Sequence, residues 1–183
     1  LIAPQYTLKN PDHKFSIEEF SFSHDRSEFY ENPEDPTNRK VIFTLNFNYP
    51  VDENSLDKNI TIKQYNYKKK NITGQKQLNF KIIYDDLNYT AYIHTDNIEI
   101  PKHEGEVKIE VSTGVRAQIS TTPYDKVVTG SQRIPGLFNY FHISNADIRV
   151  VDNDKGIPKH IAIVESSTGI APAILKNSVK FYE

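Results

Sequence analysis

The stretch that decides the fold is RKVIFTLNFNYPVD, residues Arg39–Asp52, with its continuation to residue 62. Every second position in its first half is apolar: Val41, Phe43, Leu45 and Phe47. A β-strand sends successive side chains to opposite faces, so one face of this strand is wholly apolar. The stretch therefore predicts a core strand of a β-sandwich.

The residues after this strand predict a sharp change of direction. Pro50 ends the strand, because proline has no N–H to donate to a ladder. Residues 52–57 are mostly polar and predict a short helical turn. A second strand then brings Ile60 and Ile62 to the same core. The predicted unit is a strand, a proline, a helical turn and a strand.

Composition indicates a packed globular chain and argues against nucleic acid and anionic membranes as partners. The 183 residues are 37% hydrophobic and 25% charged, with 11 Tyr and 10 Phe. A net charge of -2 gives no global field that would hold nucleic acid or an anionic membrane. The chain has no cysteine, which excludes a disulfide, a thiolate metal site and a cysteine nucleophile. No apolar run approaches the roughly 20 residues that span a bilayer.

Further alternating segments predict a chain built mainly of strands. Strands are expected at residues 15–23 with a phase change at Glu18–Glu19, and at 27–30, 78–84, 89–93, 107–111 and 127–128. Residues 32–36 have turn composition, and the polar stretch 64–74 predicts a protruding hairpin loop. Six or seven strands without helical periodicity favour an antiparallel sandwich over a βα alternation.

The chain divides into three predicted parts. Residues 1–14 are a leader or the tail of a preceding module, 15–134 form a sandwich, and 135–183 begin a second, truncated one. Pro135 and Gly136 mark the junction. An internal repeat supports this division. Four apolar residues of the first unit have counterparts at similar spacing near the C-terminus: Val51, Leu56, Ile60 and Ile62 correspond to Ile170, Leu175, Val179 and Phe181. The fold class is all-β, with tandem fibronectin- or immunoglobulin-like antiparallel β-sandwich modules, and the chain is expected to be a fragment.

Five segments carry a resemblance to a known family: residues 28–33, 39–41, 45–52, 134–138 and 164–169. They resemble the N-terminal macroglobulin-like modules of bacterial alpha-2-macroglobulins, and the likeness covers roughly residues 20–183. The family implies a large protein of many fibronectin-like sandwiches that traps proteases. Cleavage of a bait segment rearranges the molecule, and in many members a Cys-Glu thioester couples to the protease. This chain has no cysteine and so lacks that thioester.

The resemblance implies a non-catalytic scaffold fragment of a protease-trapping protein, an endopeptidase inhibitor. Its partners would be other modules of the same chain, and proteases through the parent protein. Nucleic acid is not an expected partner, and a membrane would be reached only through a lipid anchor outside this fragment. The expected location is the periplasm, with the parent protein anchored to the inner membrane.

Asp152–Gly156, with the sequence DNDKG, resembles the start of a calcium loop. An EF-hand loop needs an oxygen ligand where Gly156 stands and a bidentate glutamate where Ile163 stands. Neither is present, so a tight hairpin turn is favoured over a calcium site.

Three weaker patterns also favour structural interpretations. Tyr65–Lys70 interleaves aromatic and basic residues as a single-strand nucleic-acid platform does, but a solvated or protein-contacting loop is favoured. His142 and His160 could meet across strands, which is insufficient for a metal site. The near-duplicates Ser112–Val115 and Ser167–Ile170 have ordinary turn composition.

No enzyme is predicted, and no catalytic, cofactor-binding or metal-binding residue is assigned. The sequence contains no Gly-x-Ser-x-Gly, no His-Glu-x-x-His and no glycine-rich phosphate loop. The alternative to the scaffold is a cell-surface immunoglobulin-like tandem for adhesion or carbohydrate binding. The two interpretations differ in whether the isolated fragment binds a glycan or host protein.

Overall fold

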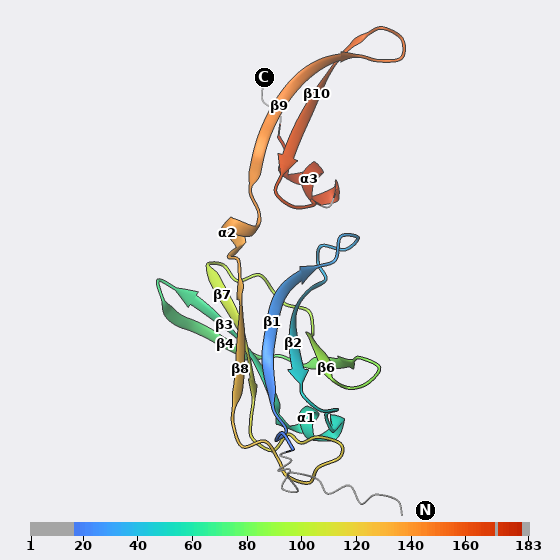
Figure 1. The fold of residues 1–183 in the computed structure, drawn as a ribbon. Helices are drawn as coiled ribbons and strands as arrows, with labels where there is room; N and C mark the ends of the chain where they lie inside the picture. The colour runs from blue at the N-terminus through green and yellow to red at the C-terminus, as the bar shows by residue number, and fades with distance from the viewer. Residues whose placement is uncertain (1–16, 171, 181–183) are drawn as a thin grey trace, which may run out of the picture.

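The computed structural model describes residues 17–170 and 172–180, and it confirms the predicted all-β architecture (Figure 1). Two four-stranded antiparallel sheets lie within residues 22–134. The first has the order β1-β2-β6-β5, with β1 (Phe22–Glu31), β2 (Arg39–Phe47), β5 (Phe80–Tyr84) and β6 (Thr90–Thr95). The second has the order β4-β3-β7-β8, with β3 (Ile60–Lys68), β4 (Asn71–Gln77), β7 (Glu104–Val111) and β8 (Val128–Ile134).

The core lies between these sheets and is centred on the predicted strand. Val41, Phe43 and Leu45 of β2 are fully buried. Buried residues of the other sheet belong to the same cluster: Ile60, Ile62, Val107, Ile109, Val111 and Ile134. Burying one such side chain stabilises the fold by about 1.5–3 kcal/mol. The alternation at residues 41–47 thus describes a core strand, as predicted.

The helical turn after Pro50 is the short helix α1 (Glu53–Asn59). Asp52 is its N-cap, and its carboxylate accepts a hydrogen bond of 2.8 Å from the backbone N–H of Ser55. This bond, followed by the nearby Arg116 guanidinium, lowers the pKa of Asp52 against the opposing effect of burial. Leu56 is fully buried and joins α1 to the core.

The start of the sandwich differs from the prediction. Residues 17–21 are not in a strand, and β1 runs unbroken from Phe22 to Glu31, with its bulge between His24 and Arg26 rather than at the glutamates. Phe20 nonetheless stacks on Phe47, with ring centroids 6.2 Å apart. Phe20 is apolar because its ring packs against the core, and not because it belongs to a strand. The alternation of Phe20 and Phe22 therefore predicted a strand that begins too early.

The polar stretch 64–74 is also different from the predicted loop. It is the end of β3, a two-residue turn and the beginning of β4. The turn residues Lys69 and Lys70 have φ of 50° and 69°. Most of β4 is exposed because it is the edge strand of its sheet, so it shows no apolar alternation. Residues 22–134 hold eight strands, in which β1 replaces the two predicted strands at 15–23 and 27–30 and β4 is an addition.

The first and last strands of the sandwich meet along one side. Ser27 of β1 donates a hydrogen bond of 2.8 Å from Oγ to the carbonyl of Ser131 in β8. The His24 ring lies directly against Gly130, where an added Cβ would come within 2.7 Å of it. Glycine is therefore needed at this point of β8 for β1 to approach, and Figure 1 shows the two strands side by side.

Beyond the sandwich the chain forms α2 (Leu137–Tyr140), the antiparallel hairpin of β9 (Ile143–Asp152) and β10 (Pro158–Ser166), and α3 (Pro172–Ser178). This order repeats β1, β2 and α1. The repeat predicts a closing strand over residues 178–183, in which Val179 and Phe181 correspond to Ile60 and Ile62. This is wrong over residues 178–180, because α3 ends at Ser178 and Val179 and Lys180 are not in a strand, and Phe181 lies outside the described residues. The division at residue 135 stays a prediction, and the predicted leader 1–14 lies outside the described residues.

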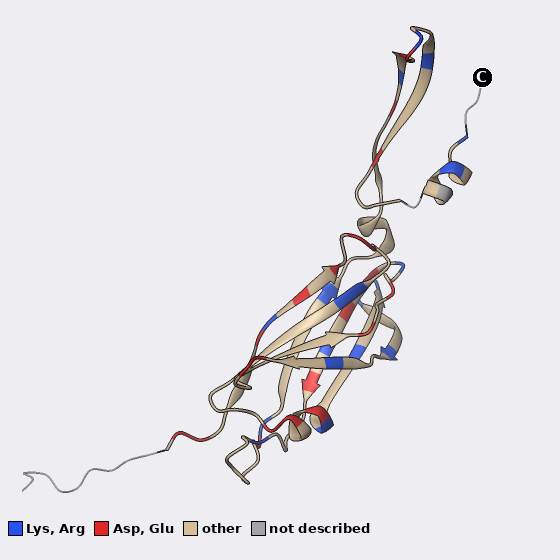
Figure 2. Cartoon of the chain, turned by 90° about the vertical axis from the view of Figure 1, so that its right-hand side faces the viewer, with Lys and Arg blue, Asp and Glu red and all other residues tan. Residues whose placement is uncertain are grey.

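The β9–β10 hairpin projects away from the sandwich (Figures 1 and 2). Cross-strand partners share a face, which places Ala146, Ile148 and Val150 beside Val164, Ala162 and His160. Ile148 is 64% and Val150 is 59% exposed. Among the described residues, no helix is long and apolar enough to cross a membrane.

Candidate functional site at the sandwich–hairpin junction

The junction that Pro135 and Gly136 predicted is held by backbone contacts. The N–H of Leu137 donates a hydrogen bond of 2.8 Å to the carbonyl of Pro101. A Cβ added to Gly136 would overlap the carbonyl oxygen of His103. The chain therefore leaves β8 in close contact with the segment that precedes β7, and only glycine allows that approach.

A polar cluster around Arg39 fixes the other side of the junction. The Arg39 Nε lies 3.2 Å from Glu31 Oε2 and 2.9 Å from the Tyr140 hydroxyl. The guanidinium also sits over the Tyr140 ring, 4.7 Å from its centroid. Thr168 Oγ1, which follows β10, reaches Glu31 at 3.4 Å. The cluster joins the start of β2 to α2 and to the loop after the second hairpin.

This cluster is shielded from solvent. The side chains of Arg39 and Glu31 are only 19% and 28% exposed. A charge pair at this depth is screened less than one at the surface, so removing either partner leaves a charge that water solvates poorly. No sequence pattern indicates this pairing, because Arg39 and Tyr140 are separated by 101 positions.

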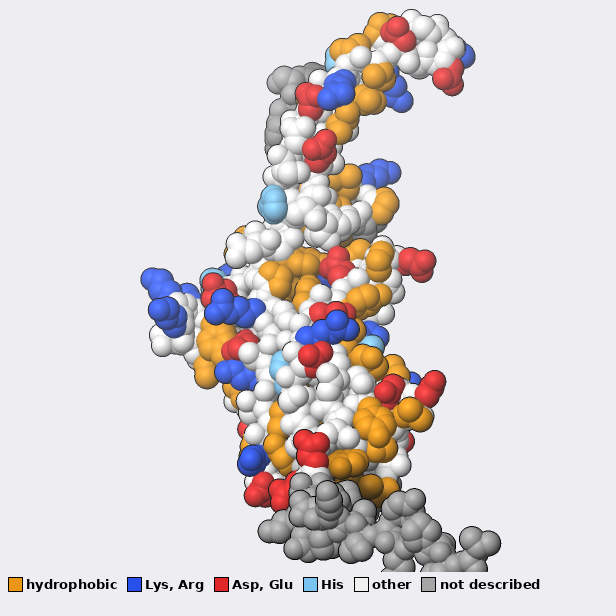
Figure 3. All heavy atoms as spheres, viewed as in Figure 1, with side chains coloured by type: hydrophobic (Ala, Val, Ile, Leu, Met, Phe, Trp, Pro, Cys, Tyr) orange, Lys and Arg blue, Asp and Glu red, His pale blue; other side chains and the backbone are white. Residues whose placement is uncertain are grey.

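A basic groove opens at the same end of the sandwich. Its volume is about 500 Å³, and it is lined by Tyr67, Lys68, Lys69, Lys70, Lys102, His103, Glu104, Phe138 and Asn139. These residues come from the β3–β4 turn, the start of β7 and α2. Figure 3 shows the basic side chains gathered at the tip of the β3–β4 hairpin. Part of the predicted Tyr65–Lys70 cluster therefore forms one wall of a groove.

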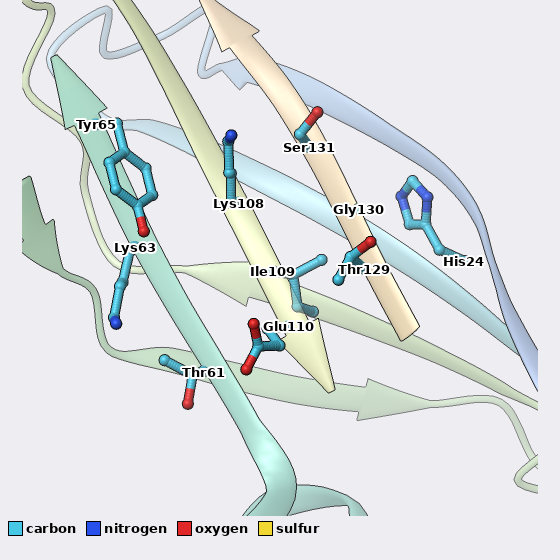
Figure 4. A pocket seen from close by; sticks show the side chains of 10 residues that line it. All are labelled: His24, Thr61, Lys63, Tyr65, Lys108, Ile109, Glu110, Thr129, Gly130 and Ser131. Atoms are coloured by element: carbon cyan, nitrogen blue, oxygen red, sulfur yellow. The ribbon is translucent and has the colours of Figure 1, made fainter. Parts of the chain in front are cut away.

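A second, shallow groove of about 540 Å³ crosses the outer face of the second sheet. Figure 4 shows its lining side chains on β3, β7 and β8, with His24 of β1 at one end. Lys108 lies between Tyr65 and Glu106: its Nζ is 5.5 Å from the Tyr65 ring centroid and 3.2 Å from the Glu106 carboxylate. The Nε2 atom of His24 is buried and has no hydrogen-bond partner among the described residues.

Glu106 is the best-connected charge near this groove. Tyr67 donates a hydrogen bond of 3.1 Å from its hydroxyl to the Glu106 carboxylate. Burial raises the pKa of Glu106, but hydrogen bonds from Ser131, Lys108 and Tyr67 outweigh it and lower the pKa overall. The carboxylate is thus held in its charged form, which suits a structural bridge between strands better than proton transfer.

The predicted hairpin turn at Asp152–Gly156 connects β9 to β10. Asn153 Oδ1 accepts hydrogen bonds from the N–H groups of Lys155 and Ile157, and Gly156 has a φ of +68°. Asparagine and glycine thus act through turn geometry here. In the part of the chain that the structure describes, no group of three His, Cys, Asp or Glu side chains could hold a metal ion.

The repeated Ser-Thr-Gly segments also have structural contacts. Ser112 Oγ lies 3.2 Å from the carbonyl of Asn59, at the end of α1. Ser167 Oγ accepts from the N–H of His142 at 3.0 Å and donates to the carbonyl of Tyr140 at 2.9 Å. Both serines therefore tie a loop to a neighbouring segment, and the hydroxyl of Ser167 contributes to the junction.

Comparison with known proteins confirms the resemblance predicted from the sequence. The Alpha-2-macroglobulin homolog of Yersinia pestis is 27% identical over 180 residues, which are 98% of this chain and 9% of that protein. The Alpha-2-macroglobulin of Pasteurella multocida is 20% identical over 190 residues, which are 100% of this chain and 10% of that protein. No family model matches the chain. The chain spans about a tenth of the length of the curated relatives it matches.

Proposed function

We propose that this chain is a non-catalytic scaffold segment of a protease-trapping protein of the alpha-2-macroglobulin type. The observation that carries the proposal is the extent of the similarity, which runs over 98% of this chain and matches one segment of a much longer protein. A sandwich with a tightly held junction is suited to bracing such a protein, because its elements keep fixed positions while other parts rearrange. The parent protein would lie in the periplasm, anchored to the inner membrane by a lipid.

The β9–β10 hairpin gives the scaffold role a specific form. Its apolar face repeats the arrangement of β1 and β2, yet Ile148 and Val150 remain exposed. In the first sandwich β2 pairs with β6 along its second edge, whereas among the described residues β10 pairs only with β9. The parent protein would supply the missing strands and facing sheet, so that residues 135–183 begin a second sandwich.

The proposal is tested on the full-length parent protein. It would be incubated with proteases of unrelated mechanisms, and its size would be followed by small-angle scattering. Residual protease activity would be measured on a small peptide and on a large protein substrate. Trapping predicts cleavage at a limited site, a change of size, and activity kept only on the small substrate. Equal loss of activity on both substrates, or no change of size, would contradict it.

A second candidate function is carbohydrate binding by an immunoglobulin-like surface domain. The observation that favours it is the groove on the outer face of the second sheet, where Tyr65 and charged side chains line one surface. Aromatic faces with neighbouring polar groups suit sugar rings. Glycan-array binding by the 183-residue chain that disappears in Tyr65→Ala would support this function, and no binding to any glycan would exclude it.

A further inference from the structure

The basic groove at the junction is a concentrated positive site on a chain of the opposite net charge. Four lysines against one glutamate leave it with three net positive charges, whereas the whole chain carries -2. Among the described residues, no carboxylate lies within 4 Å of Lys68, Lys69, Lys70 or Lys102. Such charges remain available to a partner, and their mutual repulsion is relieved when an anion binds.

The backbone conformation at the tip of the β3–β4 hairpin independently indicates that these lysines have a function. Lys69 and Lys70 both have positive φ, as a two-residue turn of type I′ requires. Asn-Gly is the pair that favours this turn, because a Cβ atom clashes with the backbone at positive φ and only glycine and, to a lesser degree, asparagine tolerate this conformation. The sequence has two lysines there instead, so charge is kept at the turn at the expense of stability. Strained backbone of this kind is concentrated at functional sites.

The groove also contains aromatic side chains, one of them from the junction. Phe138 of α2 is 69% exposed and lines the groove together with Tyr67. A partner seated here would contact the sandwich and α2 at once. Binding would therefore restrain the segment that connects the sandwich to the β9–β10 hairpin.

The chemistry of the lining favours a polypeptide over a nucleic acid. Arginine, whose planar fork recognises phosphate, is absent from the lining. Glu104 lies among the lysines and would repel a backbone that carries a charge at every unit. A peptide can place separate carboxylates near the lysines and a backbone N–H near Glu104. It can also place an apolar side chain against Phe138.

We propose that this groove binds an acidic polypeptide segment that carries an aromatic or aliphatic side chain between its carboxylates. The inference is independent of protease trapping, because it concerns a site on the sandwich itself. Binding of this kind weakens as salt rises, since the lysines are exposed and screened by ions. A partner held in this way would also add a contact between the sandwich and α2 to those that already hold the junction.

The test uses the 183-residue chain and a short fluorescent peptide of glutamates around one phenylalanine. Anisotropy titrations would compare it with the matching glutamine peptide. The double variant Lys69→Asn/Lys70→Gly removes two charges and relaxes the turn. It is expected to bind about tenfold more weakly and to unfold at a higher urea concentration. Phe138→Ser, on an exposed position, is expected to weaken binding without lowering the urea midpoint.

The control is Lys155→Gln/Lys159→Gln in the β9–β10 hairpin, which changes the net charge equally and should bind the peptide as the original chain does. The proposal is overturned if the glutamate peptide does not bind at low salt, or if Lys69→Asn/Lys70→Gly binds it unchanged. It is also overturned if single-stranded DNA or vesicles of anionic lipid bind through the same lysines more tightly than the peptide. A lower urea midpoint for the double variant would refute the claim that Lys69 and Lys70 strain the turn.

Discussion

The first hairpin of the sandwich and the β9–β10 hairpin have the same plan and opposite burial. Each is an antiparallel pair followed by a seven-residue helix, α1 or α3. Phe43 and Leu45 on the first are fully buried, whereas Ile148 and Val150 on the second are mostly exposed. The difference lies in what faces them: the sheet β4-β3-β7-β8 covers the first hairpin, and no described residues form such a sheet over the second. Alternation of apolar residues therefore predicts a strand, but how much those residues stabilise the fold depends on whether a second sheet covers them.

Truncating apolar side chains should give the largest difference in stability between the two hairpins. Phe43→Ala or Leu45→Ala is expected to lower the free energy of unfolding by about 2–5 kcal/mol, because each leaves a cavity in a packed core. Ile148→Ala, at an exposed position, should change it by less than about 0.5 kcal/mol in this chain. Urea melts of the three variants provide the comparison. Similar losses at all three positions would mean that the β9–β10 face is already covered.

The junction glycine should give the next largest effect. Gly136→Ala places a methyl group on the His103 carbonyl, so the chain must shift where it leaves β8. We expect a cost of about 1–3 kcal/mol, typical of overpacking. Gly169→Ala is the control, since its nearest neighbour would be an ordinary contact of 3.5 Å with Pro36. A Gly136→Ala protein as stable as the original in urea would show that the close approach is not required.

Tyr140 should matter less for stability than for the position of the hairpin. Tyr140→Phe removes the hydroxyl that accepts from Arg39 but keeps the ring under the guanidinium, and should cost about 0.5–1.5 kcal/mol. Tyr140→Ala removes both contacts and should broaden the range of angles between sandwich and hairpin. Residual dipolar couplings of the two parts would measure this. Unchanged couplings in Tyr140→Ala would argue that the Arg39 cluster does not fix the junction.

The cap of α1 should give the smallest effect, and one that depends on pH. The pKa of Asp52 is lowered in the folded chain, first by the Ser55 N–H and then by Arg116. Its carboxylate thus stabilises the fold above the unfolded pKa of about 3.9, and this contribution is lost as pH falls through the lower, folded pKa.

Two substitutions separate the cap from the charge. Asp52→Ala should cost about 1 kcal/mol at neutral pH. Asp52→Asn keeps a capping oxygen and should remove only the part of the acid dependence that comes from this carboxylate. Urea melts from neutral pH to about pH 3 would measure both. An unaltered acid dependence in Asp52→Asn would contradict the assignment.

The sequence predicts those elements whose own side chains face the core. The strand at Val41–Phe47 follows from alternation, and the helical turn after Pro50 follows from the proline and the polar residues 52–57. The edge strand β4 could not be predicted in this way, because its exposed polar side chains carry no periodic signal. At Phe20 the sequence pattern predicts a strand that does not form, because the Phe20 ring packs on the core although its backbone lies outside the sheet.

The junction was only partly predictable. Pro135 and Gly136 indicated a boundary, but the contact of Arg39 with Tyr140 depends on how distant elements are placed. The lysines of the β3–β4 turn could be read as a charged cluster. Only the folded structure shows that two of these lysines have positive φ angles and that Phe138 lines the same groove.

Hydrogen exchange would show whether other parts of the parent protein cover the β9–β10 hairpin. Amide protection of β9 and β10 would be measured by mass spectrometry in the 183-residue chain and in the full-length parent protein. If residues 135–183 begin a second sandwich, exchange is rapid along both strands in the 183-residue chain. In the parent protein, protection then approaches that of β2, because further strands would pair with β10 and cover Ile148 and Val150. Equally rapid exchange of the hairpin in both proteins would contradict the proposal that residues 135–183 begin a second sandwich.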